Sequence, residues 1–380
     1  MSRTPYLRGA GLLRFGRHEG KSTLDLMSEA AQAALDDAGL KRGDVDGVVC
    51  GYSTTLPHLM LSSVFCEHFG LAPSYAHSLQ LGGATGLAMT ALAAQLVAGG
   101  AAKNVLVVAG ENRATGQSRD ASVQTLAQVG HPLYEVPLGA TIPAYYALVA
   151  ARYMHDHGIS EADLAEFAVL MRAHAATHPG AHLREPIALA DVMASKPIAS
   201  PLKLLDCCPV SDGGAAVVVS CKPGAQTVRI RGAGQAHQHQ HVSAIRNFDD
   251  LGAAASAARA FSAAGVTRGD IRHAAIYDSF TATLAILLEE IGFAQRGEAG
   301  AMARAGHFAR FGALPLNLHG GLLSYGHCGV GGAMAHLVET FLQCAQRAGP
   351  RQVADPSLAF VHADGGVMSA HVSLVMERVR

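Results

Sequence analysis

The same helix–turn–strand pattern occurs twice in this chain, once in each half. Residues 31–46 read AQAALDDAGLKRGDVD, and residues 257–272 read AARAFSAAGVTRGDIR. In each copy alanines recur at helical spacing, a glycine ends the helix, an R-G-D turn follows, and an apolar strand comes next, at Gly47–Gly51 or Ala274–Tyr277. The repeat predicts two similar structural units, and this narrows the possible folds more than any other feature of the sequence.

A second matched pair lies later in each half. A predicted helix begins at Gly83-Ala-Thr-Gly-Leu-Ala-Met, and another begins at Gly329-Val-Gly-Gly-Ala-Met-Ala. Alanine-rich helices can resemble each other by chance, but the recurring order of helix, turn and strand favours a duplication. The further predicted strands are Asn104–Ala109, Ala215–Ser220, Leu358–Ala363 and His371–Met376. Strands that alternate with helices in this way are typical of an α/β fold with buried sheets.

The repeat divides the chain into residues 1–225 and 226–380, which meet around Lys222-Pro-Gly224. Residues 113–205 have no counterpart in the second half. This insertion contains a predicted helix near Thr141–His157 and another after Ser160, whose side chain is suited to cap the helix with Asp163 three residues on. An insertion of this size is either a lid over a substrate site or a surface subdomain, and the sequence leaves both open.

Composition excludes several classes of function. Net charge is −1 and only 16% of residues are charged, so nothing in the chain attracts nucleic acid or an anionic membrane. The first 20 residues do not resemble a signal peptide, and we expect no membrane span. Seven cysteines without a C-x-x-C pair suggest reduced thiols in the cytoplasm. The low charge also leads us to expect an oligomer.

Three segments place polar side chains beside glycine-rich turns. They are Asn317-Leu-His-Gly-Gly-Leu-Leu-Ser324-Tyr-Gly-His327-Cys328-Gly, Tyr277-Asp278-Ser-Phe, and His362-Ala-Asp-Gly-Gly366-Val-Met-Ser-Ala-His371. Glycines allow backbone N–H groups to approach a ligand closely, and the start of a helix adds partial positive charge. Such turns suit an oxyanion that forms during a reaction, and a neighbouring histidine is suited to proton transfer.

These segments, together with Leu204-Leu-Asp-Cys-Cys-Pro-Val-Ser-Asp-Gly-Gly, resemble the thiolase superfamily, in its SCP2-type, lipid-transfer branch. The resemblance runs nearly from end to end. It implies two βαβαβαββ halves in a five-layer αβαβα sandwich, a homodimer, and coenzyme A thioester substrates without a covalently bound cofactor. It further implies carbon–carbon bond formation or cleavage, and a small DUF35-type partner with an OB-fold and a zinc ribbon.

The resemblance also assigns roles to individual residues. His327 matches the histidine of the family's G-H-P motif, and Cys328 stands where the family usually has proline. Tyr277 matches the asparagine or histidine of a second motif. The family's nucleophilic cysteine corresponds to Gly83, and the terminal segment Ala363–Gly366 also lacks a cysteine. Because glycine cannot hold an acyl group, ordinary acyl transfer through an acyl-enzyme is in question.

Three interpretations of the function remain. A retro-aldol reaction on a CoA thioester needs no acyl-enzyme, and His327 with Tyr277 would serve it. Alternatively, Cys328 is a relocated nucleophile, although a cysteine that merely fills the place of proline is the simpler account. Thirdly, the chain is a non-catalytic subunit that binds CoA esters.

We therefore predict His327 as the main acid or base and Tyr277 as the second catalytic residue, with Asn317 and His371 in support. Gly83 and Gly366 are predicted oxyanion donors, and Asp278 and Ser324 are further substrate-binding candidates. The alternating histidines 237, 239 and 241 resemble a metal site, but no carboxylate or cysteine completes the set, so we expect no metal.

Overall fold

A computed structural model describes residues 3–224 and 226–379 of the chain. Its centre is a mixed sheet with the strand order β3-β2-β4-β7-β1-β8-β11-β10-β9. The strands are β1 Tyr6–Leu12, β2 Gly47–Gly51, β3 Tyr75–Leu79, β4 Asn104–Asn112, β7 Asp212–Ser220, β8 Val228–His237, β9 His273–Ile276, β10 Leu358–Gly365 and β11 Ala370–Arg378, and a separate small hairpin is formed by β5 Pro197–Ala199 and β6 Leu202–Lys203.

The strand pairing confirms the predicted duplication. In the first half β2 runs parallel to β4, β4 antiparallel to β7, and β7 antiparallel to β1. The second half repeats this order with β9, β10, β11 and β8. Each half thus forms its own sheet, and the two sheets join where Tyr6 and Leu7 of β1 pair with Arg229 and Val228 of β8. This pairing makes the hydrogen bonding continuous across all nine strands.

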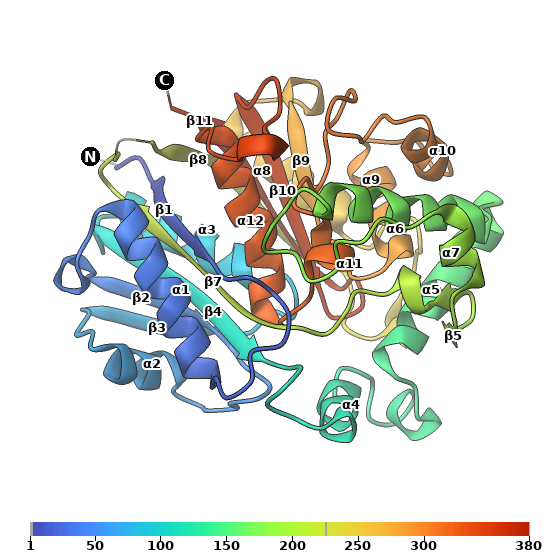
Figure 1. The fold of residues 1–380 in the computed structure, drawn as a ribbon, viewed down its shortest axis with the longest axis horizontal. Helices are drawn as coiled ribbons and strands as arrows, with labels where there is room; N and C mark the ends of the chain where they lie inside the picture. The colour runs from blue at the N-terminus through green and yellow to red at the C-terminus, as the bar shows by residue number, and fades with distance from the viewer. Residues whose placement is uncertain (1–2, 225, 380) are drawn as a thin grey trace.

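The helices form three layers around the two sheets, as the five-layer prediction requires (Figure 1). Helices α3 Thr85–Ala98 and α12 Val330–Cys344 contact each other and strands of both halves, so they form the central layer. Helices α1 Thr23–Ala38 and α2 Leu61–Phe69 cover the first sheet on its outer side. Helices α8 Ala253–Ala264 and α9 Thr281–Ile291 lie on the second half in the corresponding way.

The repeated alanines and glycines allow the outer helices to pack very closely on the sheets. A Cβ on Gly9 of β1 would lie 2.5 Å from the backbone nitrogen of Ala38 in α1. A Cβ on Gly232 of β8 would lie 2.7 Å from the backbone nitrogen of Ala264 in α8. Because real side chains never approach so closely, both strands need glycine there, and the small residues of the two halves serve the same contact.

The insertion folds into α4 Arg119–Ala127, α5 Ile142–His157, α6 Glu161–Ala175 and α7 Leu189–Ala194. Ser160 and Asp163 form the predicted capping box at the start of α6. Helices α5 and α6 pack against α9, and α6 also packs against α10 Ala299–Arg304 and α11 Gly321–Tyr325. The predicted junction at residue 225 lies outside the described residues.

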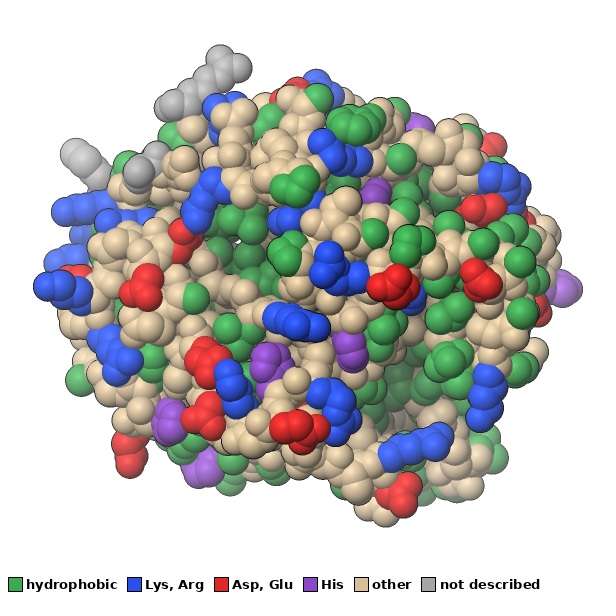
Figure 2. All heavy atoms as spheres, in the orientation of Figure 1, with side chains coloured by type: hydrophobic (Ala, Val, Ile, Leu, Met, Phe, Trp, Pro, Cys, Tyr) green, Lys and Arg blue, Asp and Glu red, His purple; other side chains and the backbone are tan. Residues whose placement is uncertain are grey.

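Positive and negative side chains are interspersed over the face shown in Figure 2, as the near-zero net charge suggests. Among the described helices none combines the length and the apolar composition that crossing a bilayer requires. All seven cysteines are free in the described part of the chain.

Candidate active site

A cavity of about 230 Å³, here called the central cavity, lies where the glycine-rich turns of both halves meet. Its walls are Tyr52, Thr54, Gly82, Gly83, Glu111, Arg113, Leu126, Val129, Ile142, Pro143, Tyr146, Cys207, Cys208, Val210, Tyr277, Ser279, Phe280, His327, Gly329 and Gly366. The insertion contributes Arg113 at its first position and five further residues, from Leu126 to Tyr146. A second hollow of about 490 Å³ shares Thr54, Gly82, Leu126 and other residues with it, so a long ligand can extend from one into the other.

Two residues predicted from the sequence to be catalytic meet at this cavity. The hydroxyl oxygen of Tyr277, just after β9, lies 2.8 Å from Nε2 of His327, just before α12. On the other side of the imidazole, Nδ1 accepts hydrogen bonds from the backbone N–H of Gly329 at 3.2 Å and from Nη1 of Arg113 at 3.4 Å. Because Nδ1 receives two donors, the proton of the neutral ring belongs on Nε2, which donates to Tyr277.

Burial keeps both members of this pair uncharged. Burial and the neighbouring charge of Arg113 lower the pKa of His327 to about 3. Burial and the nearby carboxyl of Asp364 raise the pKa of the Tyr277 phenol well above its usual value. At neutral pH, His327 is therefore a fixed hydrogen-bond donor, and the hydroxyl hydrogen of Tyr277 is left to donate elsewhere.

The Tyr277 side chain also occupies the space beside Gly83. A Cβ on Gly83 would lie 2.5 Å from Cζ of Tyr277 and 2.5 Å from the carbonyl oxygen of Asp364, and closer still to the Tyr277 hydroxyl. No side chain fits at position 83 while Tyr277 keeps its place. Tyr277 thus fills the volume that a side chain at position 83 would occupy.

The predicted oxyanion donors Gly83 and Gly366 lie in two loops that touch through their backbones. A Cβ on Gly82 would be 2.6 Å from the backbone nitrogen of Gly366, and Gly82 has a φ of +55°. Gly366 has a φ of +69°, in the left-handed region that favours glycine. This close approach brings both predicted donors to the wall of one cavity.

A carboxyl–phenol pair that the sequence did not indicate joins Tyr146 in the cavity wall to Asp364 behind it. The Tyr146 hydroxyl lies 3.1 Å from Oδ2 of Asp364 and 2.9 Å from the carbonyl oxygen of Gly366. Burial raises the pKa of Asp364 to about 7, so this carboxyl can take up or release a proton near neutral pH. The other carboxyl oxygen, Oδ1, is buried and has no partner in the described part of the chain.

Glu111 and Arg113, at the carboxyl end of β4, also line the cavity and were missed. Their position carried a usable signal, because ligands in α/β proteins bind beyond the carboxyl ends of strands. Tyr146 carried no such signal, since it lies in the non-repeated insertion and belongs to no motif.

Five other candidates from the sequence do not line the central cavity. The Asn317 side chain donates to the carbonyl of Ile276 and accepts from its N–H, both at 2.7 Å, which fixes the end of β9. Asp278 accepts from the backbone N–H of Leu322 at 2.7 Å and lies 3.3 Å from Nε2 of His336. Both side chains are buried, and their hydrogen bonds stabilise the backbone around the site.

Ser324, Cys328 and His371 are also buried outside the cavity. Ser324 accepts a hydrogen bond of 3.1 Å from Arg172. His371 bonds to the carbonyl of Met368 at 2.9 Å and to His362 at 3.2 Å. Cys328 packs in a cluster with Phe15 and Tyr325, and burial raises the pKa of its thiol well above the usual value, so it matches a space-filling cysteine.

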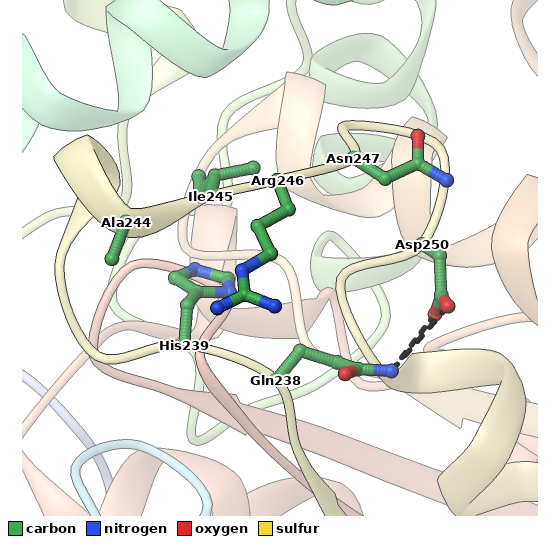
Figure 3. A pocket seen from close by; sticks show the side chains of 7 residues that line it. All are labelled: Gln238, His239, Ala244, Ile245, Arg246, Asn247 and Asp250. Atoms are coloured by element: carbon green, nitrogen blue, oxygen red, sulfur yellow. Dashed lines mark hydrogen bonds between the residues drawn. The ribbon is translucent and has the colours of Figure 1, made fainter.

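The alternating histidines near the end of β8 do not form a metal site in the described part of the chain. His239 instead borders a separate surface hollow of about 450 Å³, together with Gln238, Arg246 and Asp250. Figure 3 shows the Arg246 side chain projecting into this hollow, and Gln238 bonds to Asp250 at 3.3 Å.

Comparison with known proteins agrees with the fold. Residues 2–222 match the family described as "Thiolase, N-terminal domain", and residues 234–378 match "Thiolase C-terminal domain-like". A steroid side-chain-cleaving aldolase of Thermomonospora curvata is 33% identical over 342 residues, covering 83% of this chain and 85% of that protein. An acetyl-CoA acetyltransferase of Methanothermobacter thermautotrophicus is 28% identical, covering 96% of this chain and 97% of its own.

The solved structure named "Ltp2-ChsH2(DUF35) aldolase" superposes with a TM-score of 0.85 at 30% identity and covers 99% of this chain and 98% of its own. Both halves match thiolase family models, relatives match over most of the chain, and the fold is shared. The chain is an enzyme of the thiolase superfamily, in the group that includes SCP2-type thiolase-like proteins and side-chain-cleaving aldolases.

Proposed function

We propose that this enzyme cleaves or forms a carbon–carbon bond in a coenzyme A thioester by a retro-aldol or aldol reaction, without an acyl-enzyme. One observation carries the proposal: the Tyr277 side chain fills the space that a nucleophilic side chain at position 83 would need. A covalent route through position 83 requires a nucleophilic side chain in that space. A retro-aldol route requires a hydrogen-bond donor there, and the phenol supplies one.

In the proposed reaction the substrate is a 3-hydroxyacyl-CoA. Its hydroxyl proton leaves, the bond between Cα and Cβ breaks, a ketone or aldehyde departs, and the remaining thioester enolate is protonated at Cα. We assign the enolate oxygen to the Tyr277 hydroxyl and to the backbone N–H groups of Gly83 and Gly366. His327 strengthens the Tyr277 hydroxyl as a donor through its own Nε2–H.

The substrate's hydroxyl proton also needs an acceptor. We assign it to Asp364, reached through the Tyr146 hydroxyl that lines the cavity. A carboxyl whose pKa is about 7 suits this step, because it is partly ionised at neutral pH. This assignment replaces His327 as the base, since its Nδ1 is occupied and its Nε2 carries the proton.

Acyl transfer is the alternative, since an acetyl-CoA acetyltransferase is among the relatives. It would need a thiolate in the cavity, and the two thiols there are Cys207 and Cys208. Burial raises the pKa of Cys207 to about 12 and that of Cys208 further, which disfavours both thiolates. The other alternative, a non-catalytic CoA-ester-binding subunit, predicts binding without turnover.

We also propose a homodimer and a DUF35-type partner. Strand β3 is the outer strand of the first half and its middle residues are exposed, so its edge is open to pairing with a second copy. Exposed apolar side chains in the insertion, among them Leu133 and Leu138, offer a contact surface for a partner. The free cysteines favour a reducing compartment, and we retain the cytoplasm as the proposed location.

The test is to incubate the protein with a panel of 3-hydroxyacyl-CoA and 3-oxoacyl-CoA esters. Small products and the intact protein mass are followed together, with wild type, Tyr277→Phe and the exposed-tyrosine control Tyr134→Phe. Release of a ketone or aldehyde with a shortened acyl-CoA, lost only in Tyr277→Phe, is the expected result. An acyl adduct on a cysteine would refute the proposal, and binding without product would favour the non-catalytic subunit.

A further inference from the structure

Arg113 stands out because, among the residues that the structure describes, it is the only lysine or arginine in the wall of the central cavity. The other side chains there are mostly apolar or uncharged, including Leu126, Val129, Ile142 and Phe280. A guanidinium in protein is always charged, and removing its donors from water is costly unless a partner compensates them. Arg113 is half-buried, and its Nε is fully buried.

Arg113 has little compensation within the protein. Its Nη1 has a single long hydrogen bond of 3.4 Å to His327, and its Nε is buried without any partner in the described part of the chain. No carboxylate among the described residues forms an ion pair with it. Arg351, which is buried, shows the contrast, because its Nε and Nη2 each lie 3.0 Å from a carboxylate oxygen of Glu339.

The nearby carboxylate of Glu111 is held by other groups. Its Oε1 accepts hydrogen bonds from the Thr54 hydroxyl and from the backbone N–H groups of Thr54 and, at 2.9 Å, Thr55. Its Oε2 lies against Gly329, at the start of α12, where the helix N-terminus favours negative charge. Burial raises the pKa of Glu111 and the nearby charge of Arg113 opposes this shift, but no hydrogen bond joins the two side chains among the described residues, so the guanidinium keeps free donors.

We propose that the central cavity selects CoA esters whose acyl chain carries a carboxylate, and that Arg113 binds that carboxylate. The planar guanidinium matches a carboxylate with two parallel hydrogen bonds. Arg113 approaches His327 from the Nδ1 side, opposite Tyr277, so the acid group and the thioester carbonyl occupy opposite sides of the imidazole. The apolar wall then lies along the carbon chain between them.

This inference rests on the proposed function only in taking the ligand to be a CoA ester. Binding is therefore the appropriate test, because it needs no turnover. Calorimetry compares glutaryl-CoA with pentanoyl-CoA, which have acyl chains of equal length, on the wild type, on Arg113→Gln and on Arg119→Gln. Arg119 is an exposed arginine at the start of α4 and serves as the matched control.

We expect the wild type and Arg119→Gln to bind glutaryl-CoA about 10- to 100-fold more tightly than pentanoyl-CoA, as a charge-assisted pair provides. In Arg113→Gln the ratio should fall to about one. Using the ratio within each variant removes any general effect of the substitution on the site. Equal binding of the two esters by the wild type, or an unchanged ratio in Arg113→Gln, would overturn the inference alone. Absence of binding by both esters would overturn it together with the proposed function.

Discussion

The close fit between Gly83 and Tyr277 can be measured as a coupling between two substitutions. Gly83→Ala adds one methyl group to the central layer, where a Cβ would lie 2.5 Å from Cζ of Tyr277 and 2.5 Å from the carbonyl oxygen of Asp364. Both neighbours are buried and neither can withdraw easily, since Tyr277 is held by His327 and Asp364 lies in β10, where it pairs with His371 of β11. The protein must therefore shift to accept the methyl group.

Overpacking of a buried site costs about 1–3 kcal/mol, and we expect Gly83→Ala to lie at the upper end because two neighbours clash. Tyr277→Ala should itself cost about 3–5 kcal/mol through the lost ring and the cavity it leaves. In the double variant the methyl group enters that cavity, and only the clash with the Asp364 carbonyl remains. The double variant should thus be more stable than the sum of the single effects by about 1–2 kcal/mol.

Urea unfolding of the wild type, the two single variants and the double variant provides the free energies. Gly43→Ala is the control, because nothing lies within 4 Å of a Cβ at that position, and it should change the free energy of unfolding by less than about 0.5 kcal/mol. If the effects of Gly83→Ala and Tyr277→Ala add to within about 0.5 kcal/mol, the steric explanation for glycine at position 83 is wrong.

Three further predictions concern the polar groups around the cavity. The activity of His327→Gln should be at least about 10-fold higher than that of His327→Ala, because the glutamine amide N–H can still donate to Tyr277. Equal losses of activity in steady-state assays would contradict the donor role. Asp364→Asn should abolish turnover yet stabilise the protein above pH 7. The carboxyl ionises near pH 3.8 in the unfolded chain but only near pH 7 in the folded, buried site, so the free energy of unfolding of the wild type falls across that window by on the order of 4 kcal/mol. Equal pH profiles of unfolding for the wild type and Asp364→Asn would refute this. Cys328→Ala should keep near wild-type activity, and the Cys328 thiol should resist alkylation at pH 8 until the protein unfolds, whereas a labelled Cys328 in the native protein would reopen the relocated-nucleophile interpretation.

Local sequence patterns were sufficient to predict the main helices and strands and the duplication that relates the two halves. The R-G-D turns after α1 and α8, the glycines that end these helices in the left-handed region, and the capping box of Ser160 all depend on residues close together in the chain. Such signals act over one or two turns, so they survive in a single sequence. The glycine turns also led to Tyr277, His327, Gly83 and Gly366, four residues that the fold brings to one cavity.

Which groups of the site donate protons and which accept them could not be predicted from local sequence patterns. The sequence suggested His327 as the base, but its role depends on which groups approach Nδ1 and Nε2, and those come from β4, α12 and the end of β9. Likewise, Asp364 differs from an ordinary aspartate only because residues distant in sequence bury it.

The sequence by itself determined the duplicated α/β scaffold, the family and the absence of a nucleophile at position 83, because each is written in the order and identity of nearby residues. Only the tertiary structure decided that Tyr277 fills the space beside Gly83, that Cys328 packs in the core, and that Nε of Arg113 has no hydrogen-bond partner among the described residues. The physical reason is that steric exclusion, proton position and charge compensation are properties of contacts between segments far apart in the chain.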